Sequence, residues 1–144
     1  MSANVLIIEA RYYEHISEAL LEGAKAELEA KECSYDVLTL PGALEIPAAL
    51  QFVVEGRAKS YDAYVVLGVV IRGETSHYDI VCNESARGVY DLVAKHRLAL
   101  GNGILTVENE TQAMARAERE QKNKGGEAAA AALRMYAVKK EYGA

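Results

Sequence analysis

Apolar residues occur in four short runs along the chain, and each run predicts a β-strand. The runs lie at residues 4–9, 35–40, 63–71 and 103–107. The third, AYVVLGVVI, is the longest. Its continuous apolar character is typical of a strand that is buried on both faces of a parallel sheet.

The segments between and after these runs have the apolar period of amphipathic helices. In residues 15–30 an apolar side chain recurs at every fourth position, and residues 46–54 match the i, i+3, i+4, i+7 template. Similar patterns predict helices over 79–96, 111–120 and 124–142. Strands and helices therefore alternate, which predicts an α/β fold. We expect a three-layer α/β/α sandwich of the flavodoxin-like type, with a four-stranded parallel sheet.

The segment EAAAAALRM in the last predicted helix has two interpretations. Its alanines favour close helix packing, within one subunit or between subunits. They are also the residues with the highest intrinsic helix propensity. The sequence does not separate these alternatives.

Composition and charge exclude several classes of protein. The chain of 144 residues is predicted to form one domain, residues 1–144, and its 51% hydrophobic and 26% charged residues are typical of a globular protein. A net charge of −5 argues against nucleic-acid binding, which needs a basic surface. The apolar runs are far shorter than the roughly 20 residues of a membrane span. The chain starts without an export signal, so we expect a cytoplasmic protein.

The cysteines and histidines give no sign of a metal centre. Cys33 and Cys82 lie far apart and are interpreted as reduced core thiols. His15, His77 and His96 form no ligand cluster. His15 and His96 fall within helical stretches and are interpreted as surface residues.

Polar and conformationally special residues follow each predicted strand. The segments are RYY, PGALEIP, RGETSHYD and ENET, in the order of the four strands. Ligands of open α/β sheets bind outside the carboxyl ends of the strands. The sequence therefore predicts a ligand site at this edge of the sheet.

The segment RGETSHYD has the residues expected of an anion site. Ser76 starts an S-x-x-D pattern, which predicts it as the helix N-cap. Free N–H groups at a helix start attract anions. Gly73 lets a ligand approach the backbone, and Thr75 adds a hydroxyl. The site suits a phosphate, but a capped helix without a ligand explains the same residues.

The other candidate residues each have a structural alternative. His77 is suited to proton transfer, since an unperturbed imidazole has a pKa of about 6.5, or it is a surface residue. Glu45 accepts hydrogen bonds from a polyhydroxylated ligand or only decorates a helix start. Tyr12 and Tyr13 form a platform for a planar ring or are partly buried. Arg116, like Lys124, is a ligand contact or a solvated helix charge.

The four segments taken together are more specific than any one of them. LPGALEIP, LGVVIRGETSHYDIVCNESARGV, NGILTVENETQAMARA and NKGGEAA, in this order, resemble the lumazine synthases over residues 4–142. The resemblance implies condensation of 5-amino-6-(D-ribitylamino)uracil with 3,4-dihydroxy-2-butanone 4-phosphate. The products are 6,7-dimethyl-8-ribityllumazine, phosphate and water, in the penultimate step of riboflavin biosynthesis. It also implies that no metal or organic cofactor is needed.

The resemblance further implies a role for each candidate residue at the phosphate. His77 matches the general acid/base of the family. Gly73, Glu74 and Thr75 match the phosphate-binding turn. Arg116 matches an arginine that reaches this phosphate from the neighbouring subunit.

The pyrimidine and its ribityl chain have their own matching residues. Tyr12 matches an aromatic residue that stacks on the ring, and Lys124 a lysine near the pyrimidine carbonyl. The remaining matches are Val70 and Ile71, whose backbone meets the pyrimidine edge, and Ala43, Leu44 and Glu45, which meet the ribityl chain.

Two features depart from the family pattern. Asn102 occupies a position near the start of the fourth strand where many members carry an aromatic residue that faces the neighbour's site. The chain also begins almost at its first strand, without the extra strand of shell-forming members. We therefore expect a homopentamer, with paired pentamers as an alternative, and a monomer should be inactive because the site spans two subunits.

Two other functions fit parts of the pattern. One is a weakly active paralogue that binds flavin or lumazine or forms a shell. The other is a flavodoxin-like regulatory domain that binds phosphate, which needs neither a base at residue 77 nor a second subunit.

Overall fold

The computed structural model describes residues 3–144, and its helices and strands follow the predicted order. The elements are β1 (Asn4–Ala10), α1 (Glu14–Ala30), β2 (Ser34–Leu40), the 3-10 turn η1 (Ala43–Glu45), α2 (Ile46–Glu55), β3 (Ala63–Ile71), α3 (His77–His96), β4 (Leu100–Val107), α4 (Glu110–Ala117) and α5 (Lys124–Glu141).

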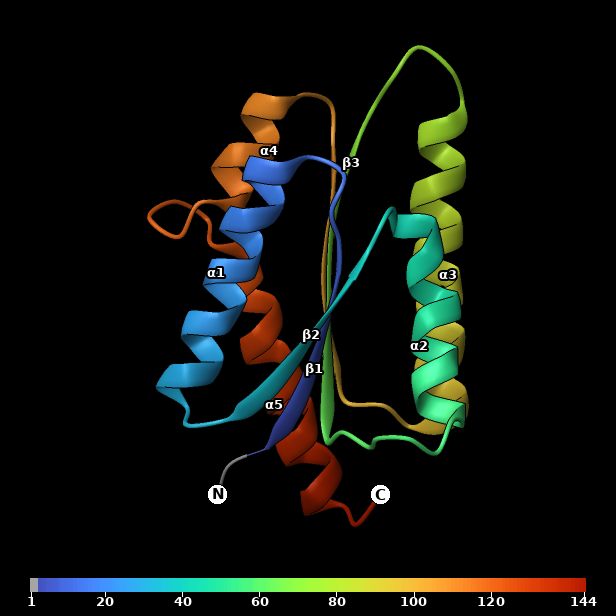
Figure 1. Ribbon diagram of the computed structural model, residues 1–144, viewed down its shortest axis with the longest axis vertical. Helices are drawn as coiled ribbons and strands as arrows, with labels where there is room; N and C mark the ends of the chain where they lie inside the picture. Colours follow the sequence, from blue (N-terminus) through green and yellow to red (C-terminus); the bar gives the residue numbers. More distant parts are fainter. Residues whose placement is uncertain (1–2) are drawn as a thin grey trace.

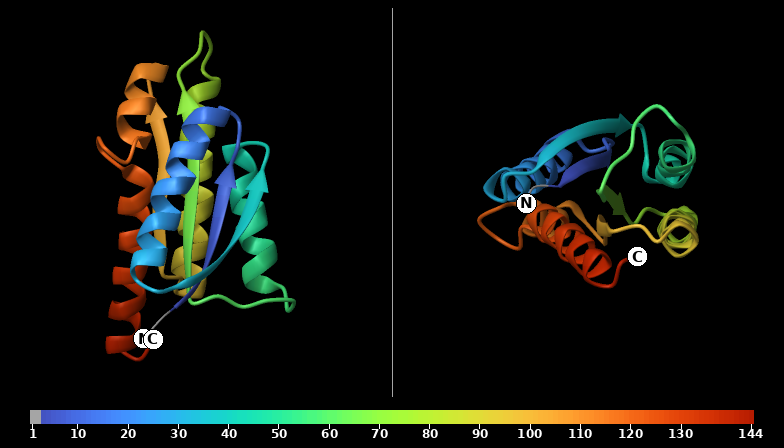
Figure 2. Two further views of the ribbon diagram at one scale, coloured as in Figure 1. Left: turned by 60° about the vertical axis from the view of Figure 1, so that its left-hand side comes forward. Right: turned by 90° about the horizontal axis from the view of Figure 1, so that it is seen from below.

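The four strands form one parallel sheet in the order β2-β1-β3-β4. This is the order of the first four strands in flavodoxin-like folds. Helices α1, α4 and α5 cover one face, and α2 and α3 cover the other (Figure 1; Figure 2). The predicted three-layer α/β/α arrangement is therefore confirmed.

Alternating residues of the central strands build two separate cores. Val5 and Ile7 of β1 pack towards α1, α4 and α5. Leu6 and Ile8 lie between them in sequence and pack towards α2 and α3. Successive strand side chains point to opposite faces, and β1 has helices on both. Burial on both faces explains why residues 5–8 of β1 are all apolar.

Helix α5 packs very closely on β4. A Cβ atom added to Gly101 would lie 1.8 Å from the carbonyl oxygen of Ala128, so only glycine fits there. Ala128, Ala129 and Ala132 are buried in the same core. For these three alanines the structure supports close packing within the subunit, and neighbouring Ala131 is exposed.

The largest differences from the predicted bounds are at the start of β4 and the end of α4, while the other ends agree to within two residues. β4 begins at Leu100, three residues before the predicted start, because Gly101 and Asn102 still pair with β3. Helix α4 ends at Ala117 instead of residue 120. The backbone at Glu118 is extended, with a ψ of 133°, and the helix stops there.

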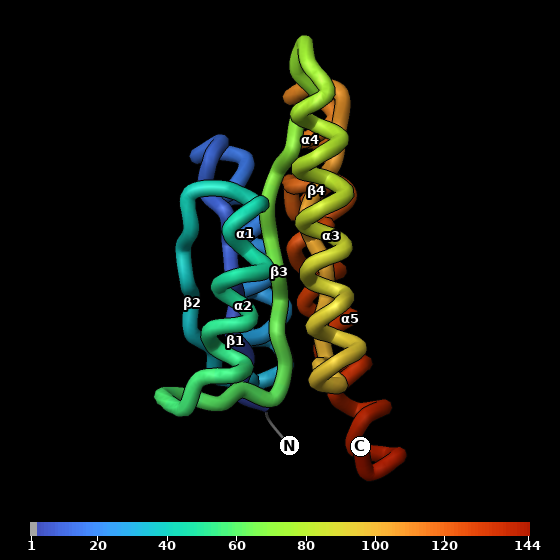
Figure 3. Tube along the Cα trace, turned by 90° about the vertical axis from the view of Figure 1, so that its right-hand side faces the viewer, coloured from blue at the N-terminus to red at the C-terminus, as the bar shows by residue number. Residues whose placement is uncertain are grey.

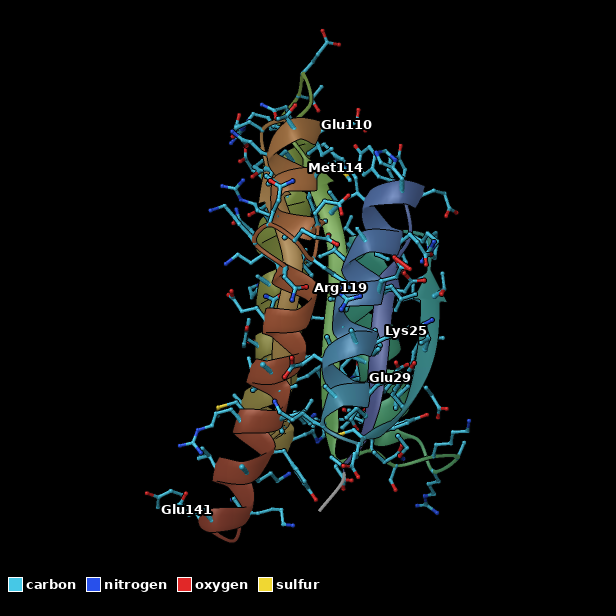
Figure 4. The ribbon with its side chains drawn as sticks, turned by 90° about the vertical axis from the view of Figure 1, so that its left-hand side faces the viewer. Lys25, Glu29, Glu110, Met114, Arg119 and Glu141 are labelled. Carbon is cyan, nitrogen blue, oxygen red and sulfur yellow. The ribbon has the colours of Figure 1, made fainter. Side chains whose placement is uncertain are left out.

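The carboxyl ends of the strands all lie at one edge of the sheet. The link between β3 and α3 projects furthest at this edge, and the start of β1 and the end of α5 lie at the opposite one (Figure 1; Figure 3). Helix α4 begins beside the start of α1, with Glu110 and Met114 near this edge (Figure 4). Lys25 and Glu29 lie further along α1, with Arg119 beside them (Figure 4). Three strand-to-helix links and the start of α4 thus meet at one end of the molecule.

Candidate active site

A hollow of about 340 Å³ lies at the carboxyl edge of the sheet. Its walls come from the links after β1 and β2, from the end of β3 and from the first turns of α3. Seven of the predicted site residues line it: Tyr12, Ala43, Leu44, Glu45, Val70, Ile71 and His77. Residues far apart in the sequence are therefore brought together as expected.

Three further lining residues were not predicted as site residues. Gly42, Val69 and Val81 also face the hollow. Val81 lies four residues after His77, which places the two side chains on one face of α3. Applying the helical period to His77 could have identified Val81 from the sequence.

Tyr12 and Tyr13 in the link after β1 lie in different environments. Tyr12 is 73% exposed and Tyr13 is partly buried. Their rings meet edge to face, with centroids 4.9 Å apart. Burial raises the pKa of the Tyr13 hydroxyl above its ordinary value. The structural alternative of partial burial thus holds for Tyr13 but not for Tyr12, whose ring is open to a ligand.

The link after β2 forms the second wall. Pro41 follows the strand, and a 3-10 turn leads into α2, which carries Pro47 in its first turn. Proline fits there because that N–H has no partner within the helix. The side chain of Glu45 folds back over Gly42, where a Cβ atom would lie 2.9 Å from its Oε1. An exposed carboxylate therefore stands at the mouth of the hollow.

The start of α3 was predicted correctly in position but not in its hydrogen bond. Ser76 directly precedes the helix, yet its side chain makes no capping bond. Its φ of −76° and ψ of 2° lie outside the extended region that a capping serine adopts. Instead, the N–H of His77 donates to Oγ1 of Thr75 at 3.2 Å. The Thr75 proton remains able to donate to a ligand.

Gly73, Glu74 and Thr75 are exposed in the projecting link and adjoin the hollow without lining it. No side chain lies within 4 Å of the Cβ position of Gly73. The backbone of the link therefore has open space beside Gly73.

Arg72 braces this link, a role that no local pattern in the sequence predicts. Its Nε lies 3.0 Å from both carboxylate oxygens of Glu108, after β4. The guanidinium also lies 4.2 Å from the ring centre of Tyr78, and Asp79 is 3.8 Å away. The bond to Glu108 raises the pKa of Arg72 above its ordinary value. Arg72 thus joins the end of β4 to the start of α3 beneath the exposed link.

Besides Gly73, Glu74 and Thr75, three more predicted site residues do not line the hollow of their own chain. Asn102 pairs with Val66, four residues before Val70 and thus about 13 Å from it along the strand. Its Oδ1 accepts the N–H of Ile104 at 2.9 Å. Arg116 donates to the carbonyl of Gln112, also on α4, at 3.0 Å.

Lys124 is the third of these residues. Its Nζ lies 3.0 Å from Oε1 of Glu127 on the first turn of α5. These three side chains therefore do not reach the hollow of their own chain. A neighbouring copy of the chain is one source of such contacts.

The two cysteines lie at the edges of the two cores, where each is only partly buried. Cys33 and Cys82 are both free thiols. Within residues 3–144, no group of three or more His, Cys, Asp or Glu side chains is arranged to hold a metal ion. None of the helices in the described range is long and apolar enough to cross a bilayer.

The arrangement can bind a planar, hydroxylated ligand and move protons on it. Tyr12 offers a ring face, Glu45 a carboxylate and His77 an imidazole at one hollow. An open parallel sheet with such a site at its carboxyl edge is typical of the class of α/β proteins that bind small molecules at their strand ends.

Comparison with known proteins names the family within this class. The family model of 6,7-dimethyl-8-ribityllumazine synthase matches residues 2–140. The synthase of Bartonella tribocorum is 60% identical over 140 residues, covering 97% of this chain and 92% of its own. That of Sphingopyxis alaskensis is 56% identical over 142 residues, covering 98% of both chains. The chain belongs to the 6,7-dimethyl-8-ribityllumazine synthase family.

Proposed function

We propose that this chain forms 6,7-dimethyl-8-ribityllumazine from 5-amino-6-(D-ribitylamino)uracil and 3,4-dihydroxy-2-butanone 4-phosphate, in riboflavin biosynthesis. The names of its close relatives support this activity. The observation that carries it is the position of His77, which lines the hollow with Tyr12 and Glu45 at the edge of the anion-receptive turn.

Each substrate has a matching part of the site. The pyrimidine ring stacks on Tyr12 and meets the backbone of Val70 and Ile71, while its ribityl hydroxyls donate to Glu45. The phosphate of the ketone lies at the backbone N–H groups of residues 73–75, with the Thr75 hydroxyl as a further donor. Helix starts hold phosphate in this way because their N–H groups are unpaired and the helix dipole is positive there.

The reaction needs little beyond alignment and proton transfer. The amine of the pyrimidine attacks the ketone, and loss of water gives an imine. Removal of a proton and departure of phosphate leave an enol. After tautomerisation the ribitylamino nitrogen closes the ring with loss of a second water. His77 moves protons in these steps, and holding two reactants aligned is worth up to about 7–11 kcal/mol.

The site is completed by a neighbouring copy in a homopentamer. Arg116 then reaches the phosphate, Asn102 faces the hollow from the neighbour's strand, and Lys124 lies near the pyrimidine carbonyl. Two observations support a subunit-spanning site. None of these three residues lines the hollow of its own chain. Two large apolar side chains also stay exposed at the walls, Leu44, which lines the hollow, and Ile80, which directly precedes Val81.

The experiment that tests this function mixes the purified chain with both substrates and follows the fluorescence of the lumazine product. The mass of the assembly is measured in the same buffer. Product formation by an assembly of five subunits, or a multiple of five, supports the proposal. Pyrimidine binding without product would instead identify a lumazine-binding paralogue. An active monomer would disprove the subunit-spanning site.

A further inference from the structure

A buried charged network lies at the carboxyl end of β1, behind the hollow. Glu9 is only 2% exposed. Its carboxylate accepts hydrogen bonds from Nε and Nη2 of Arg11, at 3.0 Å each. It also accepts the hydroxyl of Thr39, its register partner on β2, at 2.6 Å. A buried carboxylate is tolerated only when it is paired in this way.

The same guanidinium reaches the first two turns of α1. Nη1 of Arg11 lies 2.9 Å from Glu14 and 3.0 Å from Glu18. The backbone N–H of Arg11 also donates to the carbonyl of Leu40 on β2, at 2.8 Å. The bond to Glu9 raises the pKa of Arg11 above its ordinary value, with burial acting against it. Arg11 thus joins β1, β2 and α1.

This junction lies next to Tyr12, whose side chain is exposed at the hollow. Tyr12 follows Arg11 directly, and its ring meets Tyr13 edge to face at the hollow. Because Tyr12 is 73% exposed, side-chain packing other than the contact with Tyr13 restrains its ring little. Its direction therefore depends on the backbone of residues 11–13. Arg11 holds one end of this short link on the sheet and the other on α1.

We propose that Arg11, anchored by Glu9 and Thr39, is a positioning residue that holds Tyr12 in place to receive the pyrimidine ring. Arg11 does not touch the substrate. Its planar guanidinium pairs with carboxylates on β1 and on α1 at the same time. A lysine ammonium has the same charge but lacks this forked geometry. The assignment of the ring to the pyrimidine rests on the proposed function, but the ordering of the link does not.

Steady-state kinetics of Arg11→Lys test the consequence for binding. We expect the KM for the pyrimidine to rise about three- to tenfold, the size of an aromatic contact. The kcat and the KM for the phosphorylated ketone should change less than about twofold. Glu9→Gln removes the anchoring charge with little change of shape and should act in the same direction.

Arg87→Lys is the matched control. Arg87 also pairs with two carboxylates, Glu84 and Asp91, but on the exposed face of α3. Its KM values should stay at those of the unchanged protein. Equal effects of Arg11→Lys on both KM values, or on kcat alone, would contradict a positioning role.

A double-mutant cycle shows whether Arg11 acts through Tyr12. Tyr12→Leu alone should raise the KM for the pyrimidine. In the combined Arg11→Lys, Tyr12→Leu protein the rise should be no larger than in Tyr12→Leu alone, because coupled residues are not additive. Multiplied effects would show that Arg11 acts independently, and an unchanged KM in Tyr12→Leu would remove the role of the ring. Either outcome overturns the proposal.

Amide hydrogen exchange separates this proposal from the enzymatic one. Arg11→Lys should speed exchange at residues 12–17 at least fivefold, and Arg87→Lys should leave it unchanged. If the unchanged protein makes no product, the enzymatic proposal fails, and this exchange measurement still tests the link. If exchange is unaltered, Arg11 does not order the link, whatever the kinetics show.

Discussion

At the scale of single residues, the site depends on a few side chains with exposed functional atoms. His77 and Tyr12 are both exposed at the hollow, and Thr75 leaves its hydroxyl proton available. Groups that are exposed in this way contribute little to stability. Substitutions at them should therefore change catalysis and leave the fold intact.

Replacing the imidazole gives the first prediction. His77→Ala should lower kcat about 10²-fold, at the low end of the usual contribution of a general acid or base. Activity should persist, because alignment of the two substrates remains. The fluorescence assay measures the rate, and thermal unfolding checks the fold. His15→Ala, another exposed histidine, should keep full activity; comparable losses in both variants would argue against the assigned role.

At the scale of elements, contacts of the strands with a helix and with a link fix the layers that carry the site. The contact of α5 with β4 depends on Gly101, whose missing Cβ leaves room for the carbonyl of Ala128. The contact of β2 with the link after α2 depends on a hydrogen bond from Tyr61 to Asp36, at 2.6 Å. Both contacts are remote from His77, so they are expected to affect stability.

Gly101→Ala should lower the free energy of unfolding by about 3 kcal/mol, because a backbone atom cannot move aside as a side chain can. Chemical denaturation measures the loss. Gly68→Ala on β3 is the matched control, since its Cβ would meet only atoms 3.6–3.8 Å away. A similar loss in both variants would mean that crowding at Ala128 is not the cause.

Alkaline pH should weaken the contact made by Tyr61. Burial and, secondly, the bond to Asp36 raise the pKa of this tyrosine to about 12. The folded chain therefore holds the proton more tightly than the unfolded chain, whose tyrosines have a pKa of about 10. This contribution is complete below about pH 10 and is lost as the pH rises towards about 12.

Denaturation at about pH 9 and about pH 11.5 measures this loss. Tyr61→Phe should lose less stability between the two values than the unchanged protein. Some loss should remain, because burial also raises the pKa of Tyr64. An equally steep loss in Tyr61→Phe would show that this hydroxyl does not contribute.

At the scale of the whole molecule, one chain supplies only part of the proposed site. The hollow is open, and Arg116 lies on α4, bonded within its own helix. In a closed ring of identical subunits, the same surfaces meet at every interface, so each hollow receives the same residues from its neighbour. Assembly and activity should therefore be lost together.

Arg116→Ala should raise the KM for the phosphorylated ketone about tenfold or more, as expected for the loss of a charged hydrogen bond. The KM for the pyrimidine should change much less. Equal rises in both constants would show that Arg116 does not bind the phosphate.

Mixed assemblies test whether two subunits share one site. When His77→Ala and Arg116→Ala chains are unfolded and reassembled in equal amounts, about a quarter of the sites combine both intact residues. When the ketone concentration is kept well below the KM of either variant, activity should then rise to about a quarter of that of the unchanged protein, above that of either variant alone. Mixing the preassembled variants is the control. No gain after reassembly would place both residues in a site within one chain.

Much of this arrangement could be predicted from local patterns. The period of apolar residues gave the order of strands and helices, and the rule for parallel sheets placed His77 at the binding edge. Long-range pairing was harder to foresee. The start of β4 was missed because Gly101 and Asn102 lack the usual apolar signal of a strand, and this part of the strand is stabilised by pairing with β3.

The sequence alone determined the class of fold, the edge of the sheet that binds ligands and the family, since these follow from periodicity and from motifs in a fixed order. Only the tertiary structure decided that Thr75 accepts the His77 N–H while Ser76 makes no capping bond, that Arg72 and Arg11 brace two links, and that Asn102 is remote from its own hollow. The reason is physical. Periodicity reports which side of an element is buried, whereas a hydrogen bond depends on distances between groups far apart in the chain.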